Sequence, residues 1–144
     1  MIALGADHGG FELKEEIKKY LDEKNEKYVD CGTYSTDSVD YPDIAKSTCD
    51  KVISGECDLA ILFCGTGIGI SIAANKVKGI RCCACSEVFS AKMCRVHNNA
   101  NALALGGRVI GVETAKELVD AFLSNEFEGG RHQKRVDKIV ALEK

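Results

Sequence analysis

The chain has 144 residues, of which 45% are hydrophobic and 28% charged, and its formal net charge is −3. This size and composition favour a single domain with its own core. The charge balance gives no reason to expect a nucleic-acid partner, no apolar run is long enough to span a bilayer, and no signal peptide is visible. We therefore expect a cytoplasmic protein.

The eight cysteines bear on both disulfides and metals. An even number suggests disulfides in a small secreted protein, but here several cysteines lie in apolar, strand-like runs without an export signal, so we expect reduced thiols. Cys82-x-x-Cys85 and Cys94-x-x-His97 have spacings that could supply four zinc ligands. Because positions three apart on a strand face opposite sides of a sheet, Cys82 and Cys85 should not converge. We therefore predict no bound metal.

Strand-like apolar runs alternate with helix-like periodic segments along the chain. Leu13, Ile17 and Leu21 recur every four residues with charged residues between them, which is typical of an amphipathic helix. In chain order the predicted elements are a strand at 1–6, a helix at 11–24, a strand at 27–31, a helix at 42–53, a strand at 59–63, a helix at 70–77, a strand at 80–85, a helix at 87–96, a strand at 101–105 and a helix from about 114. Gly129-Gly130 should end this last helix, and we expect the basic tail that follows to be helical as well.

Two of these helices carry starting signals. Ser86 is a candidate N-cap for the helix that ends near residue 96. Thr114 and Glu117 have the spacing of a capping box. The apolar face predicted for this later helix consists of Ala115, Leu118, Val119, Phe122 and Leu123.

The alternation of elements predicts the fold. The predicted strands are apolar on both faces, as expected where helices cover both sides of a parallel sheet. We predict one Rossmann-like, three-layer α/β domain, spanning 1–144, with about five parallel strands. In such sheets ligands bind outside the carboxyl ends of the strands. Polar segments follow the first, third and fifth strands at 7–8, 64–69 and 106–108, and 97–98 ends the helix before the fifth strand.

Cys64 stands out among the thiols because it ends an apolar strand and directly precedes Gly65-Thr66-Gly67-Ile68-Gly69. Most buried cysteines are inert core residues, but a helix N-terminus or a cation stabilises a thiolate at such a position. A thiol of this kind can act as a general base. Glycine-rich main chain beside it can bind an anion. The glycine spacing fits neither the dinucleotide fingerprint nor a P-loop.

Histidines and arginines near the predicted edge suit a phosphorylated ligand. His8 lies at a strand-to-helix turn, and His97 begins a polar patch with Asn98. Arg131 and Arg135 have i, i+4 spacing on one helix face, and guanidinium groups match phosphate oxygens bidentately. His132 points elsewhere on a helical tail, and we interpret it as a surface residue.

Four segments together resemble one protein family: 5–10, 64–69, 95–101 and 106–108. In this combination and order they resemble the type B ribose-5-phosphate isomerases, which are grouped with the galactose-6-phosphate and allose-6-phosphate isomerases. The resemblance covers essentially the whole chain. It implies a Rossmann-like domain, a sugar-phosphate substrate and no metal or redox cofactor. It also implies a homodimer or tetramer whose sites are shared between subunits, with residues 130–144 packing on the partner.

The resemblance also implies roles for individual residues. Cys64 matches the base that moves a proton between two carbons of the open-chain sugar, whereas some family members carry a glutamate base elsewhere. Thr66 assists the loop that binds the enediolate oxygen, and His97 matches the residue that opens the furanose ring. The substrate-binding residues implied are Asp7, His8, Tyr41, Gly65, Gly67, Ile68, Gly69, Asn98, Arg108, Arg131 and Arg135.

Three other functions remain open at this point. An isomerase of six-carbon sugar phosphates would share all these motifs. A non-catalytic nucleotide-binding module has the same fold class, and Glu87 falls near the place of a ribose-binding acid, although the glycine spacing counts against it. The cysteine content also leaves room for a redox sensor.

Overall fold

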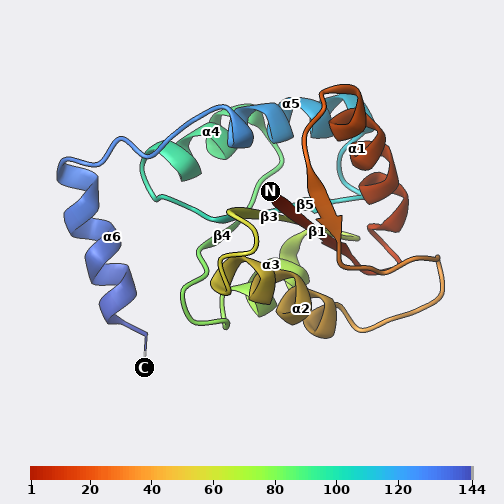
Figure 1. Ribbon diagram of the computed structural model, residues 1–144, viewed down its shortest axis with the longest axis horizontal. Helices are drawn as coiled ribbons and strands as arrows, with labels where there is room; N and C mark the ends of the chain where they lie inside the picture. Colours follow the sequence, from red (N-terminus) through yellow and green to blue (C-terminus); the bar gives the residue numbers. More distant parts are fainter. Residues whose placement is uncertain (144) are drawn as a thin grey trace.

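Strands and helices alternate along the chain (Figure 1), as the apolar periodicity predicts. The computed structural model describes residues 1–143. Its elements are β1 (Ile2–Ala6), α1 (Phe11–Glu23), β2 (Tyr28–Asp30), α2 (Tyr41–Ile53), β3 (Leu59–Cys64), α3 (Ile68–Ala74), β4 (Cys82–Ala84), α4 (Val88–Val96), β5 (Ala102–Gly106), α5 (Val112–Leu123) and α6 (Arg131–Ala141). The basic tail therefore does form a helix; Lys144, its last residue, lies outside the described residues.

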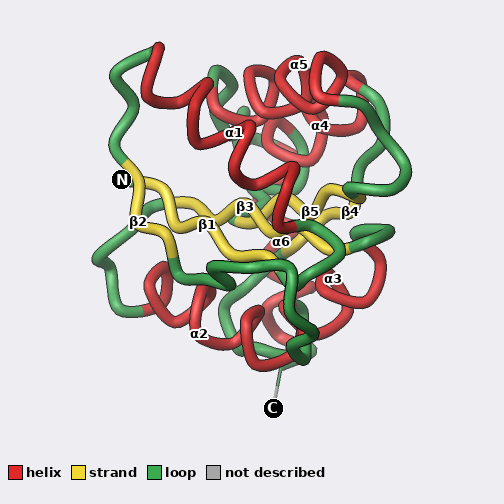
Figure 2. Tube along the Cα trace, turned by 90° about the vertical axis from the view of Figure 1, so that its right-hand side faces the viewer, coloured by secondary structure: helices red, strands yellow, loops and turns green. Residues whose placement is uncertain are grey.

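The strands form one five-stranded parallel sheet in the order β2-β1-β3-β5-β4. Helices α1, α4 and α5 cover one face, and α2 and α3 cover the other (Figure 2). This confirms the predicted three-layer, Rossmann-like fold. The order places β3 at the centre of the sheet, with β1 and β5 as its neighbours, so the three polar segments that follow these strands come together at one edge.

Alternate residues of β3 supply the two cores. Ile61 and Phe63 pack beneath α1 and α5, whereas Leu62 and Cys64 pack on the side of α2 and α3. Ile17 of α1 is fully buried, as its periodicity predicts. In the predicted apolar face of α5, four residues are buried and Leu123 is partly buried. No helix within residues 1–143 is long and apolar enough to cross a bilayer.

The predicted caps of two helices are wrong. Glu87, not Ser86, is the N-cap of α4, and its carboxylate accepts a hydrogen bond from the Ser90 N–H at 3.0 Å. Helix α5 starts two residues before Thr114, and its N-cap is Gly111, which makes no side-chain cap. Val112, at the start of this helix, is partly buried against the neighbouring core, and such packing favours helix beyond the local capping signal.

The cysteines divide between the two faces of the sheet. Cys82 packs on the side of α2 and α3, whereas Cys85 and Cys94 belong to the opposite core. The predicted divergence of Cys82 and Cys85 is therefore confirmed. All eight cysteines are free thiols.

A buried lysine fixes the chain that follows β2. Lys14 of α1 is fully buried, and its Nζ donates to Asp30 Oδ1 at 2.6 Å and to the Thr33 carbonyl at 2.7 Å. Lys18 donates to the other carboxylate oxygen of Asp30 at 2.9 Å. Burial alone would raise the pKa of the Asp30 carboxyl, but these two lysines and the Gly32 N–H hold it below its usual value. This network sets the path of the loop that leads to α2.

Candidate active site

Main-chain hydrogen bonds join the segments that follow β1, β3 and β5. The Asp7 N–H donates to the Phe63 carbonyl at 3.1 Å, and the Asp7 carboxylate accepts from the Gly9 N–H at 2.9 Å, which closes the turn after β1. The Gly107 N–H donates to the Cys64 carbonyl at 2.8 Å, and the Arg108 N–H donates to the Gly65 carbonyl at 2.9 Å. The three segments thus form one continuous surface at the carboxyl edge of the sheet.

Two glycines are required by this close packing. A Cβ on Gly10 would overlap the main chain of Phe63, so no larger residue fits where the turn after β1 crosses β3. Gly67 has φ 81°, in the left-handed region that favours glycine, and it is the N-cap of α3. This conformation turns the chain from β3 into α3 within three residues.

Cys64 is the last residue of β3, and its side chain faces the turn that follows. The Gly67 N–H donates to Cys64 Sγ at 3.0 Å. A main-chain donor aimed at sulfur stabilises negative charge there. The residue is only 4% exposed, so a small part of it reaches the surface. Thr66 is exposed beside it, and its Oγ1 accepts from the Ile68 N–H at 3.1 Å.

Arg108 and Tyr41 lie against the first and the last glycine of the 65–69 loop. A Cβ on Gly65 would lie 3.2 Å from Arg108 Nη1, so the guanidinium rests directly over that glycine. A Cβ on Gly69 would lie 2.7 Å from Tyr41 Cζ, so the phenol ring covers the first turn of α3. Both side chains therefore border the loop that Cys64 begins.

His8 joins two pockets at this edge. A pocket of about 230 Å³ is lined by His8, Gly9 and Arg108 among others, and one of about 460 Å³ includes Asp7, His8 and Tyr41. The His8 Nδ1 accepts a hydrogen bond from the Val39 N–H at 3.3 Å. In the neutral ring the proton is therefore assigned to Nε2, which makes Nε2 a donor for an anionic or hydroxyl ligand.

The structure places the remaining predicted residues elsewhere. His97 is the C-cap of α4, and the Asn98 carbonyl accepts from the side chain of Arg81, just before β4. Both therefore lie at the amino edge of the sheet. At about 3.3 Å per residue, β5 alone separates this edge from the Cys64 edge by roughly 13 Å. Arg131 and Arg135 are exposed on α6, which extends away from the sheet (Figure 1).

The interpretation of His132 as a surface residue is wrong. It is only 6% exposed and stacks on His97, with ring centroids 4.3 Å apart. The i, i+4 partner of His132 is Val136, which is also buried, so these two residues define the packed face of α6. Val136 was therefore the feature of the sequence from which the burial of His132 could have been predicted. Glu128, which faces His132 from the loop before α6, was also missed and carried no comparable signal.

Fold and geometry define an α/β protein with a glycine-rich loop and a buried thiol at the carboxyl edge of its sheet. The sequence model of the ribose/galactose isomerase family matches residues 2–139. Ribose-5-phosphate isomerase B of Escherichia coli is 53% identical over 99% of this chain and 95% of the relative.

Solved structures agree with the sequence comparison. Ribose-5-phosphate isomerase B of Clostridium thermocellum superposes with a TM-score of 0.97 at 51% identity, covering 99% of this chain and 96% of that one. The Mycoplasma genitalium structure, with bound ribulose-5-phosphate, has a TM-score of 0.93 at 43% identity, covering 99% and 95%. The chain belongs to the ribose/galactose isomerase family, and within that family it groups with the type B ribose-5-phosphate isomerases.

Proposed function

We propose that this protein interconverts D-ribose 5-phosphate and D-ribulose 5-phosphate through an enediolate, with Cys64 as the base. The observation that carries this proposal is the position of Cys64 Sγ, which ends the central strand with the Gly67 N–H aimed at it. The E. coli and C. thermocellum relatives are named for this activity, and ribulose-5-phosphate is bound in the M. genitalium structure.

The reaction moves protons only. The Cys64 thiolate removes the proton from C2 of the open-chain aldose, and the electron pair of that bond forms the C1–C2 double bond while charge passes to O1. The proton of O2 moves to O1, and Cys64 returns its proton to C1, which leaves the ketose. The N–H groups of the 65–69 loop stabilise the oxygen charge; loss of one such donor typically costs about 3 kcal/mol in other enzymes.

Each site takes groups from two copies of the chain. Within one copy, Cys64 and His97 lie at opposite edges of the sheet, and Arg131 and Arg135 lie on a projecting helix. A small sugar phosphate cannot meet them all there. The outer part of α6 also exposes apolar side chains, Ile139, Val140 and Leu142, which a second copy can cover. These observations support a homodimer, or a tetramer built from such dimers.

In this shared site His97 opens the furanose ring. The bond between C1 and the ring oxygen O4 breaks, O4 gains a proton, and the hydroxyl O1 loses one. A single imidazole that donates at O4 and accepts at O1 returns to its starting state. His97 suits this role because it ends α4, where the helix leaves its ring partly exposed beside Asn98.

Arginines anchor the phosphate. Arg108 lies beside His8 in the pocket near Cys64, while Arg131 and Arg135 come from the second copy and have i, i+4 spacing on α6. Anchoring at the phosphate holds C1 and C2 at a fixed distance from Cys64 Sγ, so binding energy far from the reacting carbons orients them.

Substitution of the sulfur tests this proposal. We expect Cys64→Ala to abolish isomerisation in a direct aldose–ketose assay while ribose 5-phosphate still raises the melting temperature of the variant. The matched control is Cys31→Ser, which changes a half-buried thiol just after the edge strand β2 and should retain activity. Full turnover by Cys64→Ala would exclude Cys64 as the base.

The six-carbon substrates are separated from ribose 5-phosphate by kinetics. We expect the highest kcat/KM with ribose 5-phosphate when it is assayed beside allose 6-phosphate and galactose 6-phosphate. The nucleotide-binding alternative loses support here because the carboxylate of Glu87 caps α4. Thermal stabilisation by a nucleotide, without stabilisation by any pentose phosphate, would restore that alternative.

A further inference from the structure

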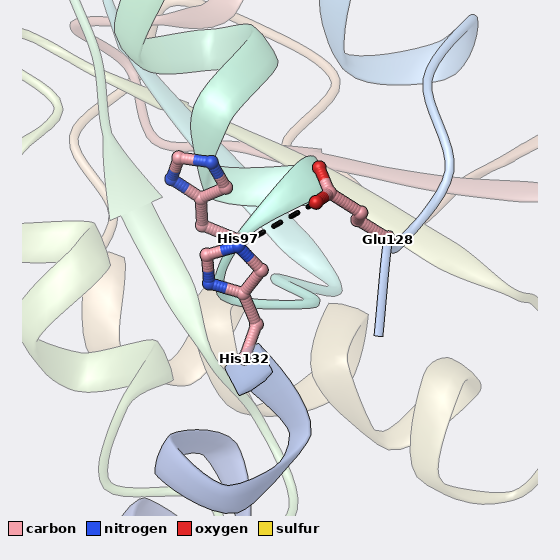
Figure 3. A group of neighbouring side chains, drawn as sticks. All are labelled: His97, Glu128 and His132. Atoms are coloured by element: carbon pink, nitrogen blue, oxygen red, sulfur yellow. Dashed lines mark ion pairs between the residues drawn. The ribbon is translucent and has the colours of Figure 1, made fainter. Parts of the chain in front are cut away.

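The histidine pair at the amino edge is built by several local features. The Glu128 N–H donates to the Val96 carbonyl at 3.0 Å, which ties the loop before α6 to the end of α4. Gly129 and Gly130 then turn the chain with φ values of 71° and 58°. This turn starts α6 so that His132 lies against His97, with an angle of 15° between the two ring planes. Figure 3 shows the two rings with Glu128 beside them.

His132 has an unusual environment for a core residue. Its Nε2 is buried without a hydrogen-bond partner, and the nearest acceptor is Glu128 Oε1 at 3.9 Å. Buried polar atoms in proteins normally have a hydrogen-bond partner, so this one needs an explanation. The charged or titratable groups around it are His97 from α4, Glu128 from the loop, and Arg131 and Arg135 from α6. Burial, followed by His97 and Arg131, lowers the pKa of His132, whereas Glu128 raises it.

Shared metal binding does not explain this arrangement. The ligand atoms of His97, Glu128 and His132 lie within 4.8 Å of one another. A metal ion, however, lies close to the plane of each imidazole that binds it, because the nitrogen lone pair is in that plane. Two stacked rings only 15° from parallel do not direct their lone pairs to a common point. The stack instead suits contact between ring faces.

We propose that His132 is a positioning residue for His97: it fixes the plane of the His97 ring and stays uncharged, so that the mobile proton of the pair resides on His97. This inference rests on the proposed role of His97 in ring opening. Two adjacent imidazoles do not readily carry positive charge together. The face of a neutral ring also attracts a cation above it, which favours protonated His97 during proton transfer.

Two substrates separate this role from a structural one. Ribose 5-phosphate must open its ring, whereas a four-carbon aldose 4-phosphate has no free hydroxyl that closes a furanose. The variant His132→Ala removes the ring that stacks on His97, whereas His132→Phe keeps an uncharged aromatic ring there. We expect His132→Ala to lower kcat for ribose 5-phosphate about 10- to 100-fold, while kcat for the aldose 4-phosphate changes by less than about 2-fold. His132→Phe should recover most of the activity on ribose 5-phosphate. Lys134→Gln, an exposed change on the same helix, is the matched control.

The pH dependence gives a second readout. Glu128→Gln removes an exposed negative charge, so it should leave the fold intact. In this variant the protonated form of the histidine pair loses a stabilising neighbour. The acid limb of the pH–rate profile for ribose 5-phosphate should therefore move to lower pH. By NMR, the pKa of His132 should fall in this variant and rise in His97→Asn. These titrations are measured without substrate.

Equal losses on both substrates in His132→Ala, no recovery of ribose 5-phosphate turnover in His132→Phe, or a His132 titration unaffected by both neighbouring substitutions would overturn the positioning role. A different result would contradict the proposed function: the unmodified protein itself would not isomerise ribose 5-phosphate, whatever the titrations show. A split between the substrates together with coupled titrations would establish the inference.

Discussion

A mixture of two inactive variants gives the sharpest test of the shared site. Cys64→Ala removes the proposed base, and His97→Asn removes the proposed ring-opening group. In a dimer that contains one chain of each kind, one site takes Cys64 and His97 from the unmodified positions of both chains. The other site carries both defects. The mixed dimer therefore regains one native site although each parent has none.

The expected activity follows from the geometry. The roughly 13 Å of β5 between the two edges keeps Cys64 and His97 apart in one chain, so only the second copy can complete a site. Random pairing of equal amounts makes about half of the dimers mixed, each with one native site of two, which gives about one quarter of the normal activity per chain. Loss of an acid–base group typically lowers rates by about 10²–10⁴-fold, so the parents should stay near or below about 1%.

The assay needs two affinity tags. The two variants are expressed together with different tags, dimers that carry both tags are isolated, and ribulose 5-phosphate formation is measured; about half of the normal activity is expected for this purified mixed dimer. The control is a mixed dimer of Cys64→Ala with Cys64→Ser, which lacks a thiol at either site and should stay inactive. If the purified mixed dimer is no more active than its parents, Cys64 and His97 of one site do not come from two different chains.

Three further predictions concern stability and the glycine loop. Asp30→Asn should destabilise the fold by roughly 3–5 kcal/mol, because it removes the nearest anionic partner of buried Lys14 and leaves only Glu15, 3.7 Å away. Since the folded-state pKa of the Asp30 carboxyl is lowered, its stabilisation is present above about pH 4 and is lost as pH falls through the folded value; denaturant titrations should show this loss in the parent and not in the variant. Gly67→Ala should cost roughly 1–2 kcal/mol by chemical denaturation because φ is 81° there, and an unchanged midpoint would show that the turn relaxes freely. Gly69→Ala should displace the exposed ring of Tyr41 and raise KM about 10-fold, equivalent to about 1.4 kcal/mol, without lowering the melting temperature; an unchanged KM would separate Tyr41 from substrate binding.

Periodic and local features made most of the fold predictable. Leu13, Ile17 and Leu21 repeat at helical spacing, and the structure forms α1 there with an end only one residue from the predicted one. The helix boundaries that were predicted wrongly depend on local backbone conformation. Helix α3 begins at Ile68, two residues before the predicted start, because the left-handed conformation of Gly67 already turns the chain into the helix.

The candidate site was likewise predictable only in part. The sequence by itself determined that the thiol of Cys64, the glycine loop and Arg108 would meet, because residues that directly follow neighbouring parallel strands share one sheet edge. It could not determine the surroundings of His132, since they depend on how two glycines turn a helix back against α4. Only the tertiary structure decided that His97 lies at the other edge, away from Cys64, because that distance is set by the sheet and not by neighbours in the chain.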